Sequence, residues 1–126
     1  MNNDELGLFL KDDRTAYKPG DTLELSVLWA LQKTPSSIEV RLFWYTRGKG
    51  TEDVEIVATT PLAPAAAGET KLNFVLPEAP YSFSGRLVSL SWAVELVVEP
   101  GSRSTRCDIT MSPTGGEVLL IMNPPS

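Results

Sequence analysis

The feature that most constrains the fold of this 126-residue chain is a two-residue alternation of apolar and polar side chains. In segment 22–31 every odd position is apolar, whereas Glu24 and Ser26 occupy the opposite parity. Because successive side chains of a strand point to opposite faces of a sheet, this alternation predicts a half-buried β-strand. The same pattern predicts further strands over 37–46, 70–76, 87–99 and 104–112, and weaker ones over 6–10, 53–60 and 117–122.

Turn-forming residues separate the predicted strands. Pro19-Gly20-Asp21 suits a tight turn, because proline presets φ and glycine accepts a positive φ. Segment 47–50, Arg-Gly-Lys-Gly, suits a hairpin. No segment has a convincing helical period, and 61–69 is expected to form a loop. The sequence therefore predicts an all-β protein, an antiparallel β-sandwich of about seven to eight strands. Its length predicts one domain over 1–122, with 123–126 as a frayed C-terminal tail.

Composition and charge exclude several kinds of function. Sixteen acidic against 11 basic residues give a net charge of -5, which argues against nucleic-acid binding. Histidine is absent, so histidine-dependent catalysis and histidine-ligated metals are excluded, and no cofactor is expected. The single cysteine, Cys107, shares the apolar parity of Ile109 and is expected to be a core thiol. The sequence thus predicts a protein that is not an enzyme.

The chain has no run approaching the ~20 apolar residues of a membrane span, and its first residues are acidic. We therefore expect a cytoplasmic protein without a membrane span. A secreted chain from which a signal peptide had been removed would have the same sequence, so that alternative stays open.

Two stretches carry a family resemblance. Residues 17–27, Tyr-Lys-Pro-Gly-Asp-Thr-Leu-Glu-Leu-Ser-Val, resemble the tyrosine-x-proline-glycine-acidic start of arrestin-like domains. Residues 74–77 and 80–85, Phe-Val-Leu-Pro and Pro-Tyr-Ser-Phe-Ser-Gly, followed by the strand segment 87–99, are similar to the proline-serine-aromatic-glycine corner of the same family.

The resemblance implies an immunoglobulin-like β-sandwich without the immunoglobulin disulfide, in a single-domain member of the arrestin-like family. It also implies binding rather than catalysis, in a scaffold or adaptor, with bacterial sporulation-control proteins among the relatives. Typical members have two sandwiches, whereas this chain has room for one. The phosphate sensor of arrestins has no counterpart here, so the resemblance implies no site residue.

A candidate protein-binding surface follows from segment 37–46. Phe43 and Tyr45 have the outward parity, between Arg41 and Arg47, and aromatic residues with arginine are typical of interaction hot spots. Leu28, with Ala30, would extend this surface if its strand paired with 37–46. A second interpretation is that a loop such as 61–69 covers both aromatic rings.

The sequence leaves two functions open. The first is a non-enzymatic protein-binding scaffold or adaptor module, whose partner is another protein or a second copy in a homodimer. It predicts that replacing Phe43 and Tyr45 by glutamate abolishes a contact while the protein stays folded. The alternative is a carbohydrate-binding or adhesion-type β-sandwich that uses Trp29, Trp44 or Tyr45 as sugar platforms.

Overall fold

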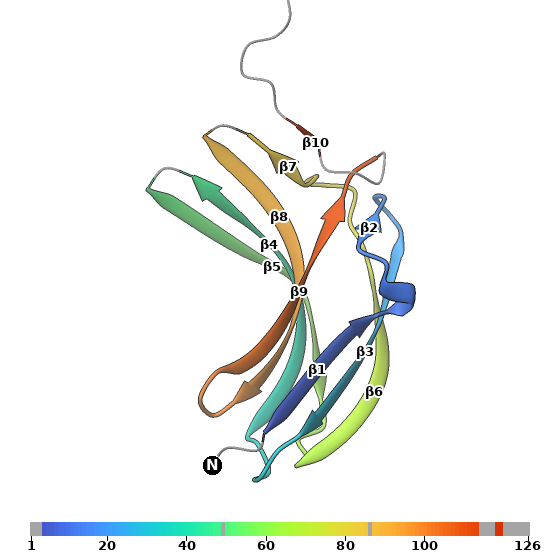
Figure 1. The fold of residues 1–126 in the computed structure, drawn as a ribbon, viewed down its shortest axis with the longest axis vertical. Coiled ribbons are helices and arrows are strands. Elements are labelled where there is room, and N and C mark those ends of the chain that lie inside the picture. The colour runs from blue at the N-terminus through green and yellow to red at the C-terminus, as the bar shows by residue number, and fades with distance from the viewer. Residues whose placement is uncertain (1–3, 49, 86, 114–117, 120–126) are drawn as a thin grey trace, which may run out of the picture.

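Two β-sheets face each other in the computed structural model, which describes residues 4–48, 50–85, 87–113 and 118–119 (Figure 1). The first sheet has the order β1-β3-β6. In the second, β8 pairs with β4 on one side and with β7 and β9 on the other, and β5 pairs with β4. The strands are β1 (Glu5–Leu10), β2 (Ala16–Tyr17), β3 (Thr22–Ala30), β4 (Ser37–Gly48), β5 (Thr51–Leu62), β6 (Ala67–Val75), β7 (Phe83–Ser84), β8 (Val88–Glu99), β9 (Arg103–Met111) and β10 (Val118–Leu119), with a 3-10 turn over Lys11–Asp13.

The core lies between the two sheets and uses the parity that the sequence predicts. From β3, residues Leu23, Leu25, Val27 and Trp29 point inward and are buried. They meet alternate residues of β4 and β8, with Trp92 fully buried among them. Burial of apolar surface of this kind is the main stabilising contribution to such a fold.

The predicted all-β sandwich is therefore confirmed. The described residues form ten strands rather than the predicted seven to eight. The two strands that were not predicted are β2 and β7, which have two residues each and are too short to show an alternation. Of segment 117–122, the structure describes a strand at 118–119. The predicted tail 123–126 lies outside the described residues.

The long hairpin of β4 and β5 carries the residues of the candidate site. It connects through the segment predicted to be a hairpin, where Gly50 has a φ of 79°. In Figure 1 one end of β4, β5 and β8 curves away from the first sheet, and β5 forms the edge of the second sheet. The predicted loop 61–69 is wrong at both ends, because β5 continues to Leu62 and β6 begins at Ala67.

Candidate protein-binding surface

Phe43 and Tyr45 lie on the outer face of the second sheet, as their parity predicts. With Ala93 of β8 they form a small apolar cluster separate from the main core. The two rings are 6.0 Å apart between centroids and tilted by 36°. They are nevertheless only 7% and 6% exposed, so these rings are not the accessible aromatic surface that the sequence suggested.

Charged side chains lie over the Tyr45 ring. The guanidinium of Arg47, from the same strand, is 5.3 Å from the ring centroid, and that of Arg106, from β9, is 5.1 Å away. The Tyr45 hydroxyl is 3.5 Å from Asp108 Oδ1. Arginines at this distance are attracted to the electron-rich faces of the ring and shield its apolar carbons with their own stems.

The exposed apolar surface of this face comes from β5, which sequence analysis did not single out. Val54 is paired with Tyr45 and Ile56 with Phe43, so both have side chains on the same outer face. They are 57% and 49% exposed. Val57, also exposed, is the extra residue at a bulge, because Leu42 pairs with Ala58 and Phe43 with Ile56. We call Val54, Ile56, Phe43, Tyr45 and Arg47 the outer patch.

The other two residues of the predicted surface, Arg41 and Leu28, lie on different sheets. Arg41 is on the outer face beside the outer patch, forms an ion pair with Glu39 and is in register with Glu95 of β8. Leu28 is on the outer face of the first sheet, because β3 pairs with β1 and β6 and not with β4. Extension of the predicted surface to Leu28 is therefore wrong.

Segment 61–69, which was one candidate to cover the Phe43 and Tyr45 rings, contacts β3 instead. The backbone carbonyl of Ala65 accepts a 2.9 Å hydrogen bond from Trp29 Nε1, and that of Ala66 accepts one from the Leu31 amide. Both contacts join the connection between β5 and β6 to the end of β3. The shielding of Tyr45 thus comes from neighbouring strands, and the loop interpretation is wrong.

Two of the three rings suggested as sugar platforms, Trp29 and Tyr45, are buried. Trp29 and Trp92 are buried in the main core, and Trp44 packs against it from the inner face of β4. Each of the first two also has its indole N–H satisfied, Trp92 by the Pro80 carbonyl at 2.8 Å. Stacking a sugar needs an exposed aromatic face, which the buried rings of Trp29, Trp92 and Tyr45 do not offer, whereas Trp44 is partly buried.

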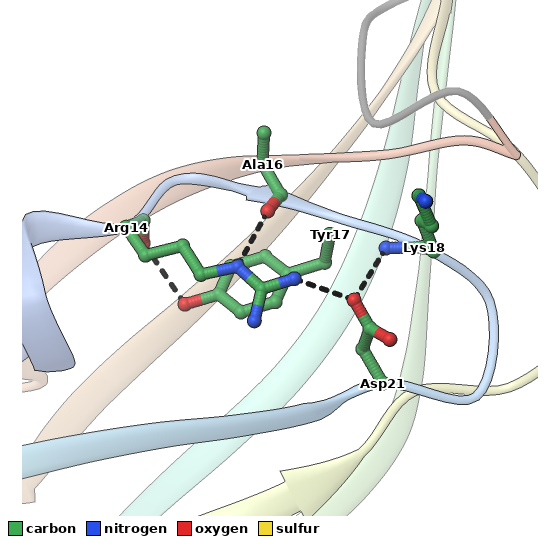
Figure 2. A network of polar contacts seen from close by, with 5 residues as sticks. All are labelled: Arg14, Ala16, Tyr17, Lys18 and Asp21. Atoms are coloured by element: carbon green, nitrogen blue, oxygen red, sulfur yellow. Dashed lines mark hydrogen bonds and ion pairs between the residues drawn. The ribbon is translucent and has the colours of Figure 1, made fainter.

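The tyrosine-x-proline-glycine-acidic stretch forms a structural turn rather than a site (Figure 2). Asp21 Oδ2 accepts hydrogen bonds from the Lys18 amide at 2.9 Å and from Arg14 Nη2 at 2.5 Å, and the backbone bond lowers the pKa of its carboxyl. The Arg14 guanidinium lies 4.3 Å from the Tyr17 ring centroid. The Tyr17 hydroxyl donates to the Arg14 carbonyl at 2.9 Å, and burial raises its pKa. These groups satisfy one another and close the end of the sandwich.

The proline-serine-aromatic corner is structural as well. Ser82 is buried, and its Oγ accepts a 3.0 Å hydrogen bond from the Met111 amide, while its own amide donates to the Met111 carbonyl. Cys107 packs against the core as predicted, although it is half-buried, and desolvation raises the pKa of its thiol. Among the described residues, no group of three or more histidine, cysteine or carboxylate side chains could hold a metal ion.

Comparisons with known proteins agree with the fold. No family model matches the sequence, and a search of curated proteins found no match. Among solved structures, the chain is similar to Spo0M, a sporulation control protein from Bacillus subtilis, with a TM-score of 0.63 and 15% identity over 89% of this chain. The predicted arrestin-like fold is confirmed by this similarity. The chain spans half the length of the Spo0M structure, and at this identity the likeness concerns the fold alone.

Two further solved structures are less similar to this chain. A β-glucosidase from Listeria innocua has a TM-score of 0.45 with 16% identity, and the chain covers 17% of it. The DNA-bound alkylpurine DNA glycosylase AlkC from Pseudomonas fluorescens has a TM-score of 0.49 with 13% identity, and the chain covers 31% of it. In the part of this chain that the structure describes, no helix is long and apolar enough to cross a membrane.

Proposed function

We propose that this chain is a non-enzymatic protein-binding module of the scaffold or adaptor kind, and that its partner contacts the outer patch. The observation that carries the proposal is the exposure of Val54 and Ile56 next to aromatic rings and Arg47 on one sheet face. Monomeric proteins expose single apolar residues freely, but contiguous apolar surface with aromatic and arginine side chains is typical of interfaces.

The burial of Phe43 and Tyr45 changes their role in this proposal. They form the base that holds Val54, Ile56 and Arg47 in place, and a partner would contact mainly the β5 side chains. Replacing the two rings by glutamate would therefore disturb the sheet itself, and the informative substitutions are on β5.

The fold similarity to Spo0M supports a regulatory protein as the setting for such a module, since that protein is described as a sporulation control protein. The lone half-buried thiol supports a reducing compartment, and we place the module in the cytoplasm as one domain over 1–122.

Affinity capture tests the proposal. The tagged protein, a Val54→Glu/Ile56→Glu variant and a Val75→Glu control would be incubated with lysate of the source organism, and bound proteins identified by mass spectrometry. Val75 suits the control because it is 68% exposed and lies on the first sheet. The proposal expects a protein that is bound by wild type and control and lost from the β5 variant. An identical set on all three, with each variant folded by circular dichroism, would refute it.

A further inference from the structure

The edge of β5 is open along its length. In the described part of the chain β5 pairs with β4 alone, and it is the last strand on that side of the second sheet. An edge strand presents a row of unpaired N–H and C=O groups, which another extended chain can pair with. The bulge at Val57 and the proline at Pro61 interrupt this row, so the regular part of the open edge runs from 52 to 56.

Along that regular part the two faces of β5 have different chemistry. Val54 and Ile56 point to the outer face, and Asp53 and Glu55, opposite Thr46 and Trp44, point to the other. All four side chains are exposed. Among the described residues no ion pair includes Asp53 or Glu55. A chain added to this edge would thus meet apolar side chains on one face and exposed carboxylates on the other.

Another long edge strand of the described chain, β6, differs from β5. On the outer face of β6, Glu69 and Lys71 alternate in sign, so this edge has no uniform charge for a partner to complement. Self-pairing of β5 is disfavoured too, because an antiparallel pair centred on Val54 sets Asp53 against Glu55 of the second copy. Like charges directly opposite each other destabilise a strand pair, and the chain has a net charge of -5.

From these observations we propose that the β5 edge binds an extended segment of another protein as an added strand, in which basic residues alternate with apolar ones. The basic residues would lie beside Asp53 and Glu55, and the apolar residues would extend the surface of Val54 and Ile56. This inference rests on the proposed function and names how the partner is bound.

A peptide of about eight residues that alternates lysine and valine is the probe. The control peptide has the same composition with its lysines in one block. Binding would be followed by NMR with the full chain, together with exchange of backbone amide hydrogens. We expect the alternating peptide to bind more tightly than the blocked one and to slow amide exchange in β5. Equal affinity for both peptides, or slowed exchange in β6 instead of β5, would overturn the proposal.

Two variations separate backbone pairing from general electrostatic attraction. Asp53→Asn/Glu55→Gln should weaken binding about five-fold, since each cross-strand charge pair contributes modestly, whereas Glu69→Gln on β6 should leave it unchanged. Peptides N-methylated at alternate residues give the second readout. Methylation of the residues whose N–H groups pair with β5 should abolish binding. Methylation of the residues in between, whose N–H groups point away from β5, should leave binding intact. Equal binding by the two N-methylated peptides would contradict strand addition.

Failure here is distinguishable from failure of the proposed function. If captured proteins depend on Val54 and Ile56 but the peptide does not bind at the β5 edge, the module binds partners by its face and strand addition is wrong. If the peptide adds to β5 but no captured protein depends on these residues, the proposed outer patch is wrong.

Discussion

Replacing Phe43 by alanine tests whether the outer patch rests on a packed base. Phe43 is 7% exposed, whereas Ile56, its direct cross-strand partner, is 49% exposed. Full burial of an aromatic side chain stabilises a protein by about 1.5–3 kcal/mol. Core truncations of phenylalanine cost about 3–5 kcal/mol because a cavity adds to this loss, but on an outer face water can fill the gap.

We therefore expect Phe43→Ala to lower the free energy of unfolding by about 2.5 kcal/mol. This value is near the upper end of the range for burial of the side chain and below the range for truncation in a core. For a chain of this length that corresponds to roughly 10 °C in Tm. Ile56→Ala, which removes a half-exposed side chain, should cost about 1 kcal/mol or less. The informative quantity is the difference between the stability losses of Phe43→Ala and Ile56→Ala, because the two residues are direct cross-strand partners.

Urea unfolding followed by tryptophan fluorescence measures both variants, with unchanged m-values as the check that the unfolded states are comparable. Equal losses for Phe43→Ala and Ile56→Ala, both below about 1 kcal/mol, would refute the account of Phe43 as a buried base.

Three further predictions follow from individual contacts. Trp92→Phe removes the donor to the Pro80 carbonyl and should cost about 1–3 kcal/mol in urea unfolding, since a polar group in the interior loses its partner. The hydrogen bond from the Lys18 amide holds the pKa of the Asp21 carboxyl below the ordinary 3.8, so the stabilising effect of this carboxylate is present above pH 3.8 and is lost as the pH falls through the folded-state pKa. Asp21→Asn should therefore reduce the fall of Tm in acid. A Tm profile that is unchanged by the substitution would contradict this. The raised pKa of Cys107 predicts slower alkylation of the native thiol than of the urea-unfolded one at pH 8, read by mass spectrometry.

Parity along a strand could be predicted from the sequence, and partners between strands could not. The inward set of β3 and the outward direction of Phe43 and Tyr45 both follow from alternation, which is a local property of the chain. Which strand lies beside which depends on contacts distant in sequence. For that reason the sequence alone does not decide whether Leu28 lies beside β4, and in the structure β3 pairs with β1 and β6.

The accessible part of the candidate surface was missed for a related reason. Segment 53–60 alternates weakly, because the bulge at Val57 shifts its period by one residue and threonines follow. The feature of this segment that points to an exposed apolar surface is the alternation of Val54 and Ile56 with acidic residues, and many solvent-facing strands have the same pattern. The shielding of Tyr45 by Arg106 could not be predicted either, since the two residues are about half the chain apart in sequence.

Site-specific photocrosslinking from β5 tests the central claim most directly. Ile56 would be replaced by p-benzoylphenylalanine in cells of the source organism, with Val75 replaced in the same way as the control from the other sheet. Cross-linked products would be identified by mass spectrometry after illumination. The account predicts that position 56 yields a defined cross-linked protein that position 75 does not. No cross-link at position 56, or the same products from both positions, would contradict it.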